Sequence, residues 1–316
     1  MKAAAKSLAV LISISLIIGT ISSCKKKDKE EPEPELDSQT KQFNDDANNY
    51  KSESDEVSDD INNYIKDVPA FGRVSGTASS PMCGVTVDST QIAQKILIFN
   101  FDGITPCSSP SRTRSGQIKV QLTTGVHWSD AGSVLTETFI NFKVTRLSDN
   151  RSVTINGVKK ITNVNGNDWL GFLAGTAKLK YRERAFNVQV KFDNSQVATW
   201  NSAHTHEWGY TPSNQRIEFK ADGDTSLNGF NTVSAWGVNR FGQAFTTNYT
   251  SPWSSNSYCG FWRPISGGLV HHVNNSDFTL TLGVDQNGNP STLNCAYGFK
   301  ITWTTGNSNG SAVFSY

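Results

Sequence analysis

The chain has 316 residues, of which 36% are hydrophobic and 18% are charged, and its formal net charge is +1. Such a chain is long enough to bury a core of ordinary size, so we expect one large domain or two small ones. The positive charge is spread thinly and forms no basic stripe, which argues against a nucleic-acid-binding protein.

The N-terminus has the pattern of a secretory signal peptide over residues 1–23. Two lysines precede an apolar run from Leu8 to Ile21 that is short for a membrane span and ends in small residues. The following Ile21-Ser22-Ser23-Cys24 resembles the bacterial lipobox, in which the cysteine receives lipid and becomes the mature N-terminus. We therefore expect acyl chains on Cys24 that anchor the protein to a membrane leaflet.

Residues 24–36 form a lysine-rich and acidic stretch that cannot bury a core, so we expect an extended tether. The segment 25–67 holds seven Lys against 14 Asp and Glu, whereas the rest of the chain from residue 68 is basic. The block after Cys24 resembles the lysine-and-acid tag of lipoproteins that are exported through the outer membrane. The expected location is the outer membrane, lipid-anchored and exposed at the cell surface.

Residues 37–68 are expected to form one amphipathic helix that stops before Pro69. Apolar residues recur there at spacings of three and four, and Ser54 is the one polar residue that interrupts the stripe. Two uses of this stripe remain open: a coiled-coil seam or a face docked on the body. Docking is favoured because the seam lacks Leu. The stripe consists of Phe43, Ala47, Tyr50, Val57, Ile61, Tyr64 and Val68.

From residue 69 to 316 the hydrophobic period changes from that of a helix to two, the period of a strand with one wet face. The predicted fold class is all-β, with a large twisted antiparallel sheet that either curls as a single sheet or packs as a sandwich. Turn signals separate the strands, including Asp102-Gly103, Asn156-Gly157 and Asn287-Gly288. Among the alternating sets are Ile96/Ile98, Ile118/Val120/Leu122, Ile140/Phe142/Val144, Phe186/Val188/Val190/Phe192 and Phe278/Leu280/Leu282/Val284.

Several motifs of this body resemble those of uncharacterised β-rich bacterial lipoproteins of the outer-membrane type. They are FDGITPC, RTRSGQIKV, DAGSVLTETFINFKV, VKKITNVNG and TWNSAHTHEW, and the similarity covers roughly residues 95–305. The resemblance implies secretion, lipidation and an antiparallel β body. It implies no activity, and the histidines at 204 and 206 depart from the arginine-rich strand that the group usually has there.

Without Cys24 the chain has an even number of cysteines, as expected for a protein in an oxidising compartment. We expect the disulfides Cys83–Cys107 and Cys259–Cys295, since each would close a local loop. Four cysteines allow three connectivities, so the pairing stays open at this point.

His204 and His206 are candidate metal ligands because strand alternation places both imidazoles on one face. No third ligand is visible nearby, so the competing interpretation is a strand face of stacked aromatic rings and polar cross-strand pairs. No cofactor is expected.

A second candidate is a ligand platform made of Trp200, Trp208, Arg182 and Arg184, since flat rings stack on sugars and paired guanidiniums bind acids. The competing interpretation is that the tryptophans cover the core and that the arginines pair with acids on a neighbouring strand. Arg112 and Arg114 form a similar pair.

Signatures of catalytic motifs such as G-x-S-x-G, H-E-x-x-H or a Walker loop do not occur in the sequence. No catalytic residue is therefore assigned, and the enzyme class stays open with a lean towards no enzyme. We expect a monomeric, lipid-anchored protein with a non-catalytic binding or structural role towards glycan or another envelope protein. The alternative is a secreted glycan hydrolase that uses a pair of carboxylates.

Overall fold

The computed structural model describes residues 38–72, 82–108, 111–193, 195–274, 276–305 and 308–316. The predicted signal peptide, Cys24 and the tether lie outside the described residues. Within those ranges, no helix combines the length and apolarity needed to cross a membrane.

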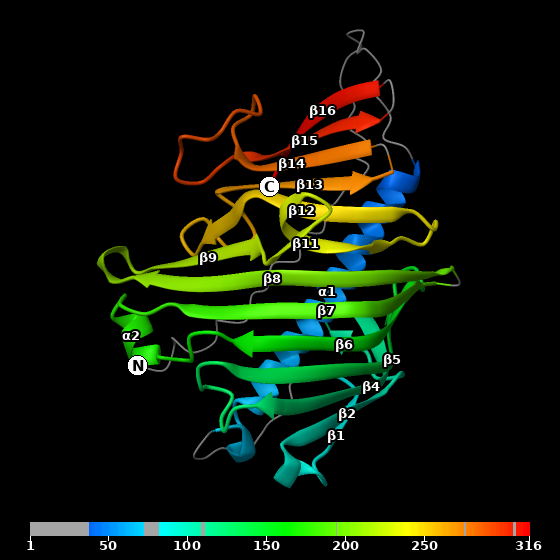
Figure 1. Ribbon diagram of the computed structural model, residues 1–316, viewed down its shortest axis with the longest axis vertical. Coiled ribbons are helices and arrows are strands. Elements are labelled where there is room, and N and C mark those ends of the chain that lie inside the picture. The colour runs from blue at the N-terminus through cyan, green and yellow to red at the C-terminus, as the bar shows by residue number, and fades with distance from the viewer. Residues whose placement is uncertain (1–37, 73–81, 109–110, 194, 275, 306–307) are drawn as a thin grey trace.

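Over the described residues the body is a single antiparallel sheet of 16 strands, which confirms the all-β class and the single-sheet alternative (Figure 1). The main path runs β1-β2-β4-β5-β6-β7-β8-β11-β12-β13-β14-β15-β16, with β3 beside β4, β10 beside β11, and β9 between β8 and β12. The strands are β1 (Val85–Asp88), β2 (Ile96–Asp102), β3 (Cys107–Ser108), β4 (Ser111–Thr124), β5 (Ser133–Arg146), β6 (Ser152–Asn163), β7 (Leu179–Phe192), β8 (Val197–Thr211), β9 (Arg216–Gly223), β10 (Thr225–Leu227), β11 (Phe230–Val238), β12 (Ala244–Asn256), β13 (Ser266–Val273), β14 (Ser276–Val284), β15 (Gly298–Thr305) and β16 (Ser308–Ser315).

One long helix, α1 (Ser38–Ile65), runs diagonally across one face of this sheet, behind the strands in Figure 1. Below we call this face the inner face and the opposite one the outer face. A 3-10 turn, Pro69–Phe71, follows the helix, and the short α2 (Trp169–Leu173) precedes β7. Two further 3-10 turns are Ile92–Gln94 and Pro212–Asn214.

The core lies between α1 and the inner face. Phe43, Tyr50, Val57, Ile61 and Ile65 of the helix are buried in one cluster with residues of β2 and β4–β8. The predicted stripe therefore docks on the body, and its apolar burial drives that docking. Because these side chains are buried against the sheet, they cannot also form the coiled-coil seam that was the alternative use of the stripe.

Each strand pair from β4–β5 to β7–β8 shifts register within its length. A shift adds one residue to a strand, bends it, and reverses which face the following side chains point to. The shifts lie between Ser115 and Gln117 (β4–β5), Phe139 and Phe142 (β5–β6), Asn156 and Val158 (β6–β7), and Ala185 and Val188 (β7–β8).

Asparagines fill these bulges in a repeated way. Asn141 and Asn187 have φ of 47° and 54°, a left-handed conformation that Asn tolerates better than most residues. The backbone N–H of Asn141 donates to Asn156 Oδ1 (2.7 Å), and that of Asn187 donates to Asn201 Oδ1 (2.8 Å). Each side chain on the next strand thus satisfies a backbone donor that the bulge leaves without its ladder partner.

The bulges overturn part of the predicted alternation. Ile140 and Phe186 were grouped with inward residues, but they are 41% and 53% exposed on the outer face. Asn156-Gly157 was predicted as a turn, yet it lies inside β6. In β2 the inward set is Leu97, Phe99 and Phe101 rather than Ile96 and Ile98.

Candidate functional site

Four charged or titratable side chains point to the inner face from four neighbouring strands. They form one oblique row across β5 to β8: Glu137 pairs with Lys159 across β5–β6, and Glu183 pairs with His204 across β7–β8. Between these pairs the row steps by two residues, because Ala185 lies opposite Lys159. Each takes an inward position in a strand whose other inward residues are largely apolar. The sheet therefore presents a polar row to the underside of α1.

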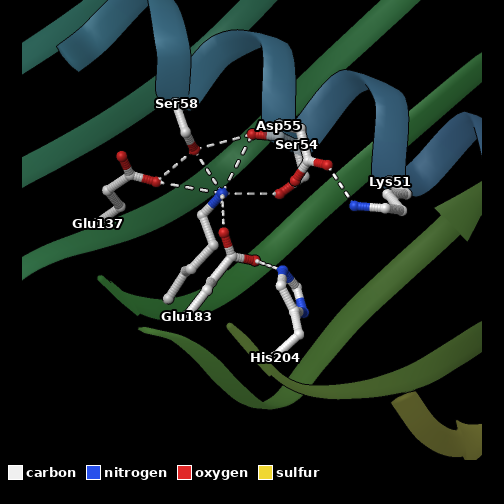
Figure 2. Close-up of polar contacts among 8 residues, drawn as sticks. Lys51, Ser54, Asp55, Ser58, Glu137, Glu183 and His204 are labelled. Carbon is white, nitrogen blue, oxygen red and sulfur yellow. Dashed lines mark hydrogen bonds and ion pairs between the residues drawn. The ribbon is translucent and has the colours of Figure 1, made fainter. Parts of the chain in front are cut away.

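Lys159 occupies the centre of this row and is 2% exposed. Its ammonium donates to the Ser54 carbonyl oxygen (3.2 Å), to Ser54 Oγ (3.1 Å) and to Ser58 Oγ, all on α1 (Figure 2). Ser58 Oγ lies 2.7 Å from Glu137 Oε2 and donates to it. Helix and sheet are thus joined by one hydrogen-bond network around a buried cation.

Carboxylates balance the charge of Lys159. Glu137 Oε2 lies 3.5 Å and Glu183 Oε2 lies 3.8 Å from the ammonium nitrogen. Burial alone would lower the pKa of Lys159, but Glu183, Glu137 and Asp55 outweigh burial and raise it. Burial raises the pKa of Glu137, against the opposing effect of Lys159. The pair is therefore mutually dependent, since either charge alone would be strongly disfavoured at this depth.

The cluster reaches towards solvent through α1. Lys51, whose side chain is 55% exposed, forms an ion pair with Asp55 at 2.5 Å (Figure 2). Burial favours protonation of Asp55, but Lys51 and Lys159 outweigh it and lower the pKa of Asp55 to about 2. One turn later, burial and the nearby Asp55 raise the pKa of Asp59 to about 8.

His204 and His206 lie side by side, with ring centroids 4.7 Å apart, as the strand alternation predicts. His204 Nε2 is 3.4 Å from Glu183 Oε1 (Figure 2). Burial lowers the pKa of both histidines, which favours neutral imidazoles. Among the described residues no group of three or more His, Cys, Asp or Glu side chains is arranged to hold a metal ion. The metal site predicted for this pair thus lacks a third ligand in this part of the chain.

Further ion pairs join α1 to the sheet along its length. Arg114 lies 2.6 Å from Asp60 and 3.3 Å from Glu56, and Arg112 contacts Glu56 and Glu53 as well. Both arginines are 2% exposed. The expected pairing with acids is formed, but the prediction that these acids lie on a neighbouring strand is wrong, because they come from α1.

A third pairing lies nearer the start of α1, where Arg240 binds both carboxylate oxygens of Asp46 at 2.5 Å. A small open pocket of about 50 Å³ adjoins this pair and is lined also by Asn49, Arg146 and Phe192. Arg240 stacks over the Phe192 ring at 4.9 Å. The helix is therefore held by Arg240 near its start and by Lys159, Arg112 and Arg114 along its second half.

The four residues of the predicted ligand platform do not come together. Trp200 is 5% exposed and packs in the core against Phe43 and Tyr50 of α1. Arg182 and Arg184 point to the outer face, opposite Thr205 and Ala203, and both pair with Asp224. A single platform is excluded because the tryptophans and the arginines lie on opposite faces of the sheet.

Trp208 remains accessible near the end of β8. It is half-buried, and its ring centroid lies 4.5 Å from Phe219 and 5.3 Å from Phe261. Phe261 belongs to the loop between β12 and β13, which the disulfide Cys259–Cys295 fixes to the loop before β15. The second predicted disulfide, Cys83–Cys107, is also formed.

Sequence reasoning missed Glu137, Lys159 and Glu183 as one site. A sequence signal for this site exists: a charged residue replaces an apolar one at an inward position of the strand. In Leu135-Thr136-Glu137-Thr138-Phe139, for example, Glu137 takes the inward position between two apolar residues. Ser54, the interruption of the helix stripe, was a second signal, since a polar residue on a docked face needs a buried partner.

No known protein family, curated protein or solved structure matches this chain. The resemblance to β-rich lipoproteins stays a prediction from the sequence.

Proposed function

We propose that this chain is a lipid-anchored envelope protein at the surface of the outer membrane, with a non-catalytic binding or structural role. The anchor rests on the signal peptide and on Cys24. The non-catalytic role rests chiefly on one observation: α1 covers the ionisable row of the sheet, and the charge of Lys159 is already balanced by Glu137 and Glu183. The row therefore serves to hold the helix on the sheet.

The hydrolase alternative needs two carboxylates that flank a substrate in an open groove. Glu137 and Glu183 are the carboxylates nearest to such a pair, but both are bound to Lys159, and Glu137 is 0% exposed. A glycan could reach Glu137 only after α1 had left the sheet. This geometry favours the non-catalytic reading.

A binding role is supported by the aromatic group of Trp208, Phe219 and Phe261. Half-buried rings that meet at a strand end offer apolar faces for stacking on a sugar ring. The disulfide beside Phe261 keeps that loop in place, which lowers the entropic cost of binding. The proposed ligand class is therefore a glycan of the cell envelope.

Membrane association tests the anchor: the wild-type protein should float with membranes, and Cys24→Ala should release it. Purified protein is then titrated with envelope glycans while tryptophan fluorescence is followed. Trp208→Ala should weaken binding at least several-fold. Trp169→Ala, at a tryptophan that is 46% exposed on α2, serves as the matched control. Release of reducing ends that is lost in Glu137→Gln and Glu183→Gln would instead establish the hydrolase.

A further inference from the structure

The outer face of β4 to β8 carries almost only positive charge. Glu137, Glu183 and Glu207 are the acidic residues of these five strands. Glu137 and Glu183 point to the inner face, where they meet Lys159, so Glu207 is left alone on the outer face.

Lysines cover the same face. The cross-strand pairs Lys119–Thr138, Lys143–Thr154, Thr154–Lys191 and Lys160–Arg184 place these cations together, since directly opposite residues share a face. Among the described residues, the ion pairs of this face join Lys178 to Glu207 and Arg182 and Arg184 to Asp224. Lys119, Lys143, Lys160 and Lys191 stand outside these pairs. We call these four the free lysines of the outer face.

Exposed apolar side chains lie among these lysines. Ile140, Val158 and Phe186 are 41%, 38% and 53% exposed, and Val158 pairs directly with Phe186 across β6–β7. They follow the line of bulges across the sheet, so they form a stripe on an ordered strand surface. Large apolar side chains grouped on a surface mark a site of contact with another surface.

We propose that this outer face docks on an anionic lipid surface. Lysine is depleted from the cores of protein–protein interfaces, which argues against a protein partner. Arg182 and Arg184, whose guanidinium groups suit bidentate binding of a single phosphate, already form ion pairs with Asp224. Lysine stems lie along apolar surface while their ammonium groups reach headgroup phosphates, and the apolar stripe enters the edge of the acyl layer.

The proposal rests in part on the lipid anchor proposed above, which would hold the body close to a bilayer. Thirteen residues separate Cys24 from Ser38, and such a length spans at most about 45 Å when extended. A tether of this length allows the body to orient its outer face towards the membrane. It also sets a high local concentration of lipid, so the docking contact itself need only be weak.

The test uses the full lipidated chain in vesicles, with phosphatidylcholine alone or mixed with phosphatidylglycerol. A water-soluble amine reagent labels lysines, and mass spectrometry reads each position. We expect the labelling of the free lysines to fall about three-fold or more in anionic vesicles and to recover in high salt. Lys66, exposed after α1, is the internal control and should label equally in both vesicles. Equal labelling of the free lysines in both vesicles would overturn the proposal.

Matched variants sharpen the result. Lys160→Gln should lower the affinity of the outer face for anionic vesicles by roughly five-fold, the factor expected for the loss of one charge near an anionic surface. Protection of the remaining free lysines should fall with it, and Lys66→Gln should leave that protection unchanged. Replacing Ile140 and Val158 together with Thr keeps strand propensity and should also reduce protection. If the chain fails to float with neutral vesicles, the anchor has failed instead. Stronger protection of the same lysines by a soluble acidic polysaccharide than by anionic vesicles would replace the membrane with a glycan.

Discussion

Lys159 of β6 and Ser54 of α1 are 105 positions apart in the sequence, yet the ammonium nitrogen of Lys159 lies 3.1 Å from the Ser54 hydroxyl. This contact sets the register of the helix on the sheet. Apolar burial favours docking but tolerates sliding by a turn, whereas a buried cation accepts only the position that satisfies its hydrogen bonds. The network therefore adds specificity to a contact that the hydrophobic effect stabilises.

Removing the central cation should destabilise the protein strongly. Lys159→Met leaves Glu137 buried without its partner, and breaking a buried pair in this way costs about 3–5 kcal/mol. Lys160→Met, the neighbouring residue on the outer face, should change stability by less than about 0.5 kcal/mol. Urea unfolding measures both. A loss below about 1 kcal/mol for Lys159→Met would show that the network is not needed for stability.

A double variant that removes both Lys159 and Glu137 tests whether the pair contributes stability or fixes the register of α1. In Lys159→Met with Glu137→Leu, both charges are removed, so most of the lost stability should return. Protection of α1 amides from hydrogen exchange should recover less than global stability, because apolar contacts alone hold the helix in several registers. Full recovery of both quantities would argue against a role in register.

Two aspartates on successive turns of α1 should respond to pH in opposite directions. The pKa of Asp59 is raised to about 8, so the stability from its protonated form is present below about pH 4 and is lost as pH rises towards 8. Asp59→Asn should therefore stabilise the protein by about 2 kcal/mol at about pH 9 and have little effect at about pH 4.

Asp55 provides the contrast. Its pKa is lowered to about 2, so its contribution is present above about pH 4 and is lost as pH falls towards 2. Asp55→Asn should destabilise the protein at neutral pH, and the difference from wild type should shrink as pH falls to about 2. Urea midpoints across pH for both variants check the signs. The same pH trend in both variants would contradict the assignment of charge states on this helix.

The sequence predicted the elements well because their hydrophobic periods are strong. The helix stripe from Phe43 to Val68 and most strands follow from local spacing. The prediction that Phe186 points inward was wrong, because the bulge at Asn187 reverses the alternation of side chains along β7. No local sequence pattern indicates that bulge. The Lys159 cluster was missed for another reason: its members become neighbours only through strand order, register and the position of α1.

Glycine at the first bulge should be indispensable. Gly116 has φ of 88°, and a Cβ built there would lie 2.1 Å from the carbonyl oxygen of Asn141. Gly116→Ala combines a left-handed backbone with a clash against backbone that cannot rotate away, so it should cost more than about 2 kcal/mol. Gly132→Ala is the matched control, because its φ is 78° but nothing lies within 4 Å of the added Cβ. It should cost only about 1 kcal/mol from the backbone conformation. Thermal unfolding compares the two, and equal losses would mean that the close approach of β4 and β5 at Asn141 does not constrain the sheet.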